Sequence, residues 1–149
     1  MNSSLAVFRE PTPVEKIFNR VFGFLVGIGF PFPHKYLLLV RGRKSGKLYS
    51  TPVNLLEVRG KRFLVAPRGR TQWVRNAETA GEVMLKKGST LLEFHLRSLS
   101  EAEKHEILKA YLDSFKSEVQ RYFSVAAGSP AESFAAIAAN YPVFELLAA

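Results

Sequence analysis

Short apolar runs that alternate with glycine-containing turns constrain the fold of this chain more than any other feature. Six runs have the length and composition of strands, at residues 36–41, 48–58, 62–66, 83–87, 90–97 and 142–146. Two of the connections, Arg59-Gly60-Lys61 and Gly88-Ser89, are short enough to be hairpin turns. Hairpin-linked strands pair antiparallel, and this many strands around one small core favour a barrel.

Helical patterns flank and interrupt these strands. Pro13 followed by apolar residues at helical spacing predicts a helix over about 13–27, and Thr71 can cap a short helix over Gln72–Ala80. Ser100 and Glu103 form a capping box before an amphipathic helix whose apolar stripe is Ile107, Leu108, Tyr111, Leu112 and Phe115. Residues 120–140 are predicted to be helical with a break at 128–130. At 149 residues, one domain is expected.

The turn between the first two strands carries the strongest functional signal. It reads Gly42-Arg43-Lys44-Ser45-Gly46-Lys47, and backbone N–H groups in such a turn can form an anion nest beside the cationic side chains. An ordinary solvated hairpin tip uses the same residue types, so both interpretations stay open. A P-loop is excluded, because only three residues separate Gly42 and Gly46 and a strand follows them.

Charge is concentrated around this turn. Residues 41–70 contain nine cations and one anion, Glu57, and therefore carry a net charge of +8, which is the net charge of the whole chain. The remaining twelve cations and twelve anions cancel. A nucleotide, a polyanionic cofactor tail, nucleic acid or an anionic lipid surface would each suit this segment.

Other features restrict the chemistry. The chain has no cysteine, which rules out disulfides and thiolate chemistry and fits a cytoplasmic protein. The apolar run Val21–Pro33 is too short to span a membrane and favours packing in a core or groove over an interfacial position. No metal site is expected, because His34, His95 and His105 lack ligand spacing. No serine lies in a nucleophile elbow.

Several motifs in a fixed order resemble one known family. They are Gly42-Arg43-Lys44-Ser45-Gly46, Thr51-Pro52, the segment from Phe63 to Gly69, the segment from Gln72 to Asn76, and the closing Pro142-Val143-Phe144. Over about residues 15–147 the chain resembles the deazaflavin-dependent nitroreductase family. The resemblance implies an α+β fold over residues 1–149, an antiparallel split β-barrel of about six strands flanked by helices, similar to FMN-binding split barrels.

The resemblance also implies an activity and a cofactor site. The expected enzyme transfers a hydride from reduced coenzyme F420 to an electron-poor acceptor such as a quinone or a nitro compound. The coenzyme carries a phosphodiester and a polyglutamate tail, which match the basic segment. The implied cofactor-binding residues are Arg43, Lys44, Ser45, Gly46, Lys47, Thr51, Pro52, Ala66, Pro67, Arg68, Gly69, Gln72 and Trp73. Tyr49 and Tyr141 are candidate proton donors, beside water.

Departures and alternatives leave the acceptor open. Gln72 and Ala77 differ from the commonest family residues, and the tyrosine-rich C-terminal region of the nitroreductases is not clearly matched. FMN is the alternative cofactor, and a non-catalytic binder of flavin, deazaflavin or lipid is the alternative function. No nucleic-acid module is visible, so no nucleic-acid partner is expected. An N-terminal apolar surface could contact a membrane peripherally, close the barrel or form a homodimer; it comprises Phe18, Val21, Phe22, Leu25, Ile28, Phe30 and Phe32.

Overall fold

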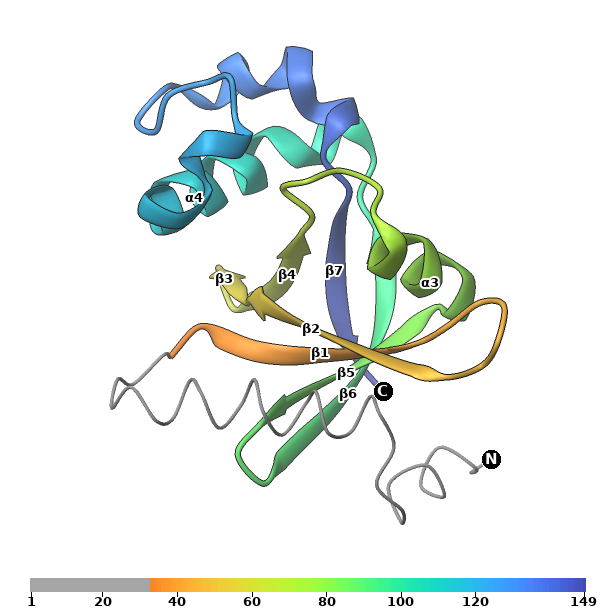
Figure 1. The fold of residues 1–149 in the computed structure, drawn as a ribbon. Coiled ribbons are helices and arrows are strands. Elements are labelled where there is room, and N and C mark those ends of the chain that lie inside the picture. Colours follow the sequence, from red (N-terminus) through yellow and green to blue (C-terminus); the bar gives the residue numbers. More distant parts are fainter. Residues whose placement is uncertain (1–32) are drawn as a thin grey trace.

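Seven strands form one antiparallel sheet in the computed structural model, which describes residues 33–149. The strands are β1 (Lys35–Arg41), β2 (Leu48–Asn54), β3 (Leu56–Val58), β4 (Lys61–Val65), β5 (Glu82–Lys87), β6 (Thr90–Ser98) and β7 (Val143–Ala148). They lie in the order β2-β1-β5-β6-β7-β4-β3, and every neighbouring pair is antiparallel. The sheet curls on itself with helices around it (Figure 1). The predicted α+β split β-barrel is confirmed.

The prediction of one strand over 48–58 was wrong, because this segment forms two strands. Leu55 separates β2 from β3, and its backbone N–H donates to the carbonyl of His34 at 2.7 Å. The chain bends there, so β2 and β3 stand at opposite ends of the strand order although they are adjacent in sequence. The hairpin predicted at Arg59-Gly60 is confirmed, with φ of 52° and 78° at its two central residues.

Two predicted helices are confirmed and a third is replaced by tighter turns. The structure contains α3 (Gln72–Ala80) and α4 (Glu101–Val119), and the Ser100–Glu103 capping box is present. Thr71 occupies the N-cap of α3 but makes no side-chain capping bond. Residues 120–140 form only the 3-10 segments η1 (Gln120–Tyr122) and η2 (Ala131–Asn140). Gly128, with φ of 90°, and Pro130 interrupt the region between them.

The hydrophobic core has two main parts. One fills the barrel and includes Leu38, Leu64, Leu85, Phe94 and Leu146. The other lies between the sheet and α4, and it contains the whole apolar stripe predicted for that helix. Because these α4 side chains are buried, truncating a fully buried leucine of the helix would cost roughly 2–5 kcal/mol. This packing fixes the C-terminal end of α4 against the barrel.

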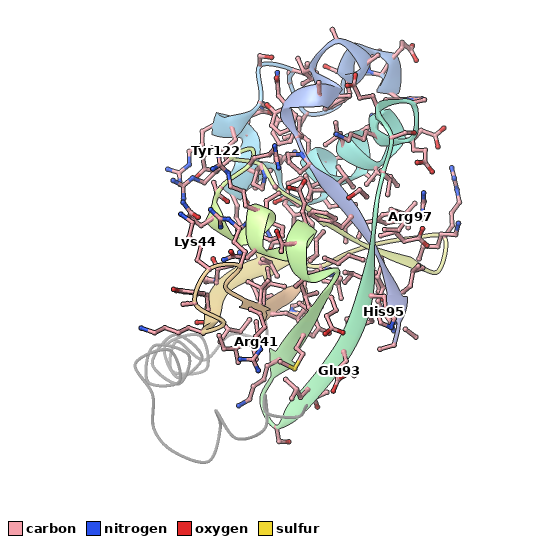
Figure 2. All side chains as sticks on the ribbon, turned by 90° about the vertical axis from the view of Figure 1, so that its right-hand side faces the viewer. Arg41, Lys44, Glu93, His95, Arg97 and Tyr122 are labelled. Atoms are coloured by element: carbon pink, nitrogen blue, oxygen red, sulfur yellow. The ribbon has the colours of Figure 1, made fainter. Side chains whose placement is uncertain are left out.

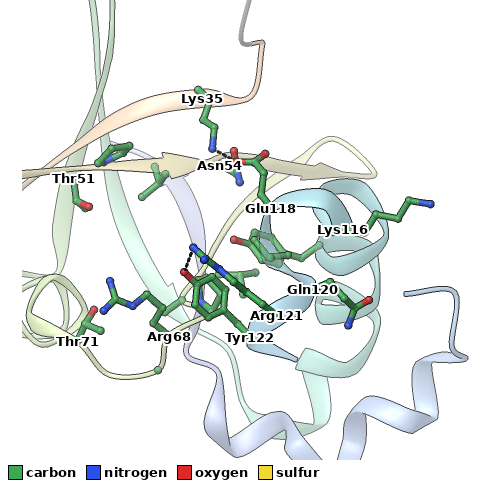
Figure 3. Close-up of a pocket in the computed structure, with 18 of the residues that line it drawn as sticks. Lys35, Thr51, Asn54, Arg68, Thr71, Lys116, Glu118, Gln120, Arg121 and Tyr122 are labelled. Atoms are coloured by element: carbon green, nitrogen blue, oxygen red, sulfur yellow. Dashed lines mark hydrogen bonds and ion pairs between the residues drawn. The ribbon is translucent and has the colours of Figure 1, made fainter. Parts of the chain in front are cut away.

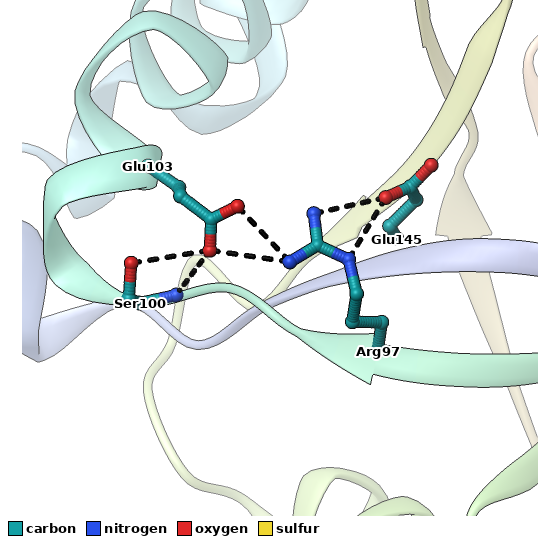
Figure 4. Close-up of polar contacts among 4 residues, drawn as sticks. All are labelled: Arg97, Ser100, Glu103 and Glu145. Atoms are coloured by element: carbon teal, nitrogen blue, oxygen red, sulfur yellow. Dashed lines mark hydrogen bonds and ion pairs between the residues drawn. The ribbon is translucent and has the colours of Figure 1, made fainter.

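A charged network fixes the other end of α4 (Figure 4). Arg97 on β6 donates from Nε to Oε1 of Glu145 on β7 at 3.0 Å and from Nη1 to Oε2 of Glu103 on α4 at 3.0 Å. These carboxylates, Glu145 first, raise the pKa of Arg97. The hydrogen bond from the backbone N–H of Ser100 has the largest effect in lowering the pKa of Glu103, and the hydrogen bond from Arg97 lowers it further. The network joins two strands to the first turn of the helix.

The helix predicted over about 13–27 and the apolar surface that begins at Phe18 and ends at Phe32 lie outside the described residues. Within residues 33–149, no helix is both long and apolar enough to cross a membrane.

Candidate functional site

Two cavities that share part of their lining lie on one side of the barrel, and we call them together the groove. The α4 cavity, of about 620 Å³, lies between β2, the loop after β4 and the C-terminal end of α4 (Figure 3). The hairpin cavity, of about 540 Å³, lies between the β1–β2 hairpin and α3. Both are lined by Thr51, Arg68, Thr71 and Trp73. Lys44 at one end and Tyr122 at the other lie on the same side of the molecule (Figure 2).

The β1–β2 hairpin turn is closed by its own hydrogen bonds. The Gly42 N–H donates to the Lys47 carbonyl at 2.7 Å, and the Gly46 N–H donates to the Gly42 carbonyl at 3.0 Å. Gly46 has φ of 76°, a conformation that favours glycine. The Arg41 guanidinium also donates to the Gly46 carbonyl at 2.8 Å. The predicted anion nest therefore cannot use the Gly46 N–H, which is engaged inside the turn.

Asn76 of α3 holds this hairpin in place. Its side chain is 5% exposed, and its Oδ1 accepts from the backbone N–H of Arg43 at 3.0 Å and from Arg43 Nη1 at 2.8 Å. One amide oxygen thus fixes both the backbone and the guanidinium of the first cation in the turn. The sequence prediction did not include Asn76 among the binding residues. The feature that could have identified Asn76 is its polar side chain at a helix position between Val74 and Ala77, which are both buried.

The basic segment at residues 41–70 does not gather at one site. Of its nine cations, Arg43, Lys44 and Arg68 line the groove. Others pair with acidic side chains elsewhere: Arg59 with Glu106, Arg62 with Glu57 and Arg70 with Glu78. The groove gains its remaining cations from segments outside 41–70, namely Lys35, Lys116 and Arg121. Its positive charge is thus built by the fold rather than by one stretch of sequence.

The loop after β4 and Trp73 form the middle of the groove. The Ala66 N–H donates to the carbonyl of Pro142, the residue before β7, at 2.9 Å, and the Gly69 N–H donates to the Ala66 carbonyl at 3.2 Å. These bonds fix the loop beside the start of β7. Gly69 has φ of 83°, and the loop needs this conformation to turn. The Trp73 ring lies 6.1 Å from the Phe144 ring and lines both cavities. A planar ligand would meet an aromatic surface and backbone groups here.

One wall of the α4 cavity comes from residues that the sequence prediction missed. Arg121 lies over the Tyr122 ring at 4.8 Å and donates from Nη2 to the Tyr122 hydroxyl at 2.8 Å. Lys35 of β1 forms an ion pair with Glu118 of α4 across the cavity (Figure 3). Tyr111 and Asn54 also line it. These residues lie far apart in sequence, and no local pattern connects them.

The two candidate proton donors lie in different environments. Tyr49 is 44% exposed and lines the hairpin cavity, and a Cβ at Gly42 would come within 2.5 Å of its ring. Tyr141 lines neither cavity; it stacks on Phe123 at 4.4 Å and donates to the Tyr122 carbonyl at 2.5 Å. Burial raises the pKa of Tyr141. Only Tyr49 of this pair faces the groove.

The structure brings most of the predicted cofactor residues together. Gly46 and Lys47 line neither cavity. The others line one or both: Arg43, Lys44, Ser45, Thr51, Pro52, Ala66, Pro67, Arg68, Gly69, Gln72 and Trp73. Cations and hydroxyls lie at the hairpin end, and an aromatic ring lies at the middle. This donor set fits a long anionic cofactor with a planar ring. Among residues 33–149, no cluster of three or more His, Cys, Asp or Glu could hold a metal ion.

The fold places this chain among the split-barrel proteins, and the groove suits a long anionic cofactor with a planar ring. The sequence model of one such family, the F420H(2)-dependent quinone reductase family, matches residues 14–126. The chain belongs to this family. It is therefore an oxidoreductase that depends on coenzyme F420, as the resemblance implied, and neither the FMN alternative nor the non-catalytic binder is supported.

Solved structures show the same fold at low sequence identity. A structure described as an F420-H2 dependent reductase is 22% identical, with a TM-score of 0.53, and the match covers 76% of this chain and 94% of that one. A structure described as a domain-swapped dimer is 19% identical, with a TM-score of 0.53 and coverage of 91% and 99%. A protein of unknown function from Agrobacterium tumefaciens is 21% identical, with a TM-score of 0.55 and coverage of 76% and 47%. Among curated proteins, none matches.

Proposed function

We propose that this protein reduces a quinone with reduced coenzyme F420, and that a nitro compound is a second acceptor of the same kind. The observation that carries the proposal is this groove: Arg43 and Lys44 line its hairpin cavity, Trp73 lines both cavities, and the α4 cavity lies beyond Trp73. A long anionic cofactor and a separate small acceptor would each find a matching section of it. Family membership supports the reaction of reduced coenzyme F420 with a quinone.

The hairpin cavity is the proposed place for the anionic part of the cofactor. Arg43 is held by Asn76, and Lys44 and Ser45 line the same cavity. Cations of this kind make charge-assisted hydrogen bonds to phosphate and carboxylate groups. The ring system would lie along the loop at Pro67, with its fixed backbone, and against Trp73. The other predicted residues, among them Thr51, Pro52, Ala66 and Gln72, would complete the contacts.

The α4 cavity is the proposed place for the acceptor. Reduced coenzyme F420 supplies the hydride when bound, and the acceptor also takes a proton to become a hydroquinone. The protein orients both partners and restricts water. For the proton, the Tyr122 hydroxyl is suitable, because it accepts a bond from Arg121 and keeps its own O–H to donate. Tyr49 and solvent are the other candidates.

The experiment that tests the cofactor assignment is a titration of the purified protein with coenzyme F420 and with FMN, each at low and high salt. We expect coenzyme F420 to bind more tightly and its affinity to fall with salt, because the groove meets several negative charges. Tighter binding of FMN would overturn the assignment. A salt-independent affinity for coenzyme F420 would contradict the proposed role of Arg43 and Lys44.

Residues 1–149 are proposed to form one domain that assembles as a homodimer. Support comes from the structure described as a domain-swapped dimer, which matches 91% of this chain. Light scattering after size-exclusion chromatography measures the mass directly. A measured mass equal to that of a single chain, at micromolar protein concentration, would contradict the proposed dimer.

A peripheral membrane contact through the apolar N-terminal residues remains a prediction. It would bring the enzyme to a lipid-dissolved quinone. Flotation with anionic vesicles at low salt tests it, with Phe22→Ser and Phe30→Ser as variants. Protein that stays below the vesicles would exclude the contact.

A further inference from the structure

One buried polar group in the α4 cavity has an unsatisfied hydrogen-bonding atom. Asn54 is 8% exposed and lines the cavity at the end of β2. Its Oδ1 is buried and has no hydrogen-bond partner. Buried polar atoms in folded proteins are almost always paired, so an unpaired one calls for an explanation. Lys35 also lines this cavity, but its ammonium pairs with Glu118 and forms no hydrogen bond to this oxygen (Figure 3).

Tyr111 holds the other side of the Asn54 amide. The Asn54 side chain interacts with the Tyr111 hydroxyl and opposes the rise in the pKa of Tyr111 that burial causes. Tyr111 is itself fixed, because it is buried and its ring packs against Phe115 at 5.3 Å. A half-turn of the amide exchanges its oxygen and its NH₂ group, and a single hydroxyl can satisfy only one of the two positions. In either orientation the amide keeps one group free for a ligand.

We propose that Asn54, anchored by Tyr111, is a specificity-determining residue that binds one oxygen of the acceptor. This inference rests on the proposed function. An amide suits a quinone in both of its states: the NH₂ group donates to the quinone carbonyl, and the amide oxygen accepts from the hydroxyl of the hydroquinone. The hydride comes from the reduced cofactor and the proton from elsewhere, so Asn54 transfers nothing and only positions the acceptor.

Binding without cofactor gives the first test. Trp73 is the only tryptophan of the chain and lines the same cavity, so menadione binding can be followed by quenching of its fluorescence. Asn54→Leu keeps a similar volume but removes the amide, and menadione should then bind about tenfold more weakly. Its melting temperature should change little, because removing the unpaired amide oxygen offsets the loss of the partner of the buried Tyr111 hydroxyl. Asn140→Leu, the same change at an exposed residue outside the groove, should bind menadione like the wild type.

Turnover gives the second test and separates the two proposals. In the Asn54→Leu variant, KM for menadione should rise about tenfold while the affinity for coenzyme F420 stays unchanged. A wild type that reduces no quinone would refute the proposed function, whereas an active wild type matched by Asn54→Leu in both binding and KM would refute this inference alone. If Asn54→Leu does not fold, Tyr111→Phe decides: it removes the anchor, and menadione affinity equal to that of the wild type would refute the inference.

Discussion

The substitution Asn76→Asp tests how the hairpin cavity recognises its ligand. Asn76 Oδ1 accepts two hydrogen bonds from Arg43, at 3.0 and 2.8 Å, and an aspartate oxygen can accept both. The fold should therefore be retained. The new negative charge, however, neutralises Arg43 and would face the anionic part of the cofactor. Two like charges about 6 Å apart repel by about 3 kcal/mol at an effective dielectric of 20, which sets an upper limit near a 100-fold loss of affinity.

The measurement is a titration with coenzyme F420 at low and high salt, together with thermal unfolding. For Asn76→Asp we expect a normal melting temperature, an affinity reduced 10- to 100-fold at low salt, and a smaller reduction at high salt. Asn76→Ala should behave differently, because it leaves the Arg43 N–H unpaired and should destabilise the fold by about 1–3 kcal/mol. Asn140→Asp places the same charge on an exposed residue outside the groove and is the matched control.

Wild-type affinity in Asn76→Asp, with the same dependence on salt, would refute this reasoning. It would show that the anionic part of the cofactor lies elsewhere, for example beside the cations of the α4 cavity. A variant that unfolds would instead show that the neutral amide is needed for structure.

Three further predictions concern charge and stability. Arg43→Ala combined with Lys44→Ala should weaken the binding of coenzyme F420 and flatten its salt dependence; an unchanged affinity would mean that the hairpin is a solvated tip. Arg97→Ala should destabilise the protein by about 1–2 kcal/mol in urea unfolding, because it leaves the mostly buried Glu145 without its cation, although the guanidinium is partly exposed. Burial raises the pKa of Tyr111, so its contribution to stability is complete below pH 10 and declines above it, and Tyr111→Phe should flatten that alkaline decline. A Tyr111→Phe variant that loses stability above pH 10 as steeply as the wild type would contradict this prediction.

Local patterns in the sequence predicted most of the elements, because their causes are local. The capping box at Ser100 and Glu103 and the apolar stripe of α4 depend on residues within a few positions of each other. The bend at Leu55 was missed because its cause, the His34 carbonyl, comes from another segment. Residues 120–140 have helical composition, and Gly128 and Pro130 account for the break between η1 and η2, but the sequence carries no signal for the 3-10 winding of η2.

The site was predictable on one side only. The hairpin and the loop after β4 carry contiguous motifs, and most of those residues line the groove. The opposite wall is assembled from β1, the end of β2, α4 and η1, so no spacing rule connects Asn54, Tyr111 and Tyr122. The basic segment at residues 41–70 likewise predicted the groove only in part, because Arg59, Arg62 and Arg70 form ion pairs outside it.

The most direct test is anaerobic mixing of the wild-type protein with reduced coenzyme F420 and menadione, followed by the appearance of oxidised coenzyme. We predict oxidation well above the protein-free rate, with one hydroquinone formed for each coenzyme oxidised and no reaction when the quinone is omitted. Oxidation at the protein-free rate, with the cofactor shown to be bound, would contradict the assignment of this groove to quinone reduction.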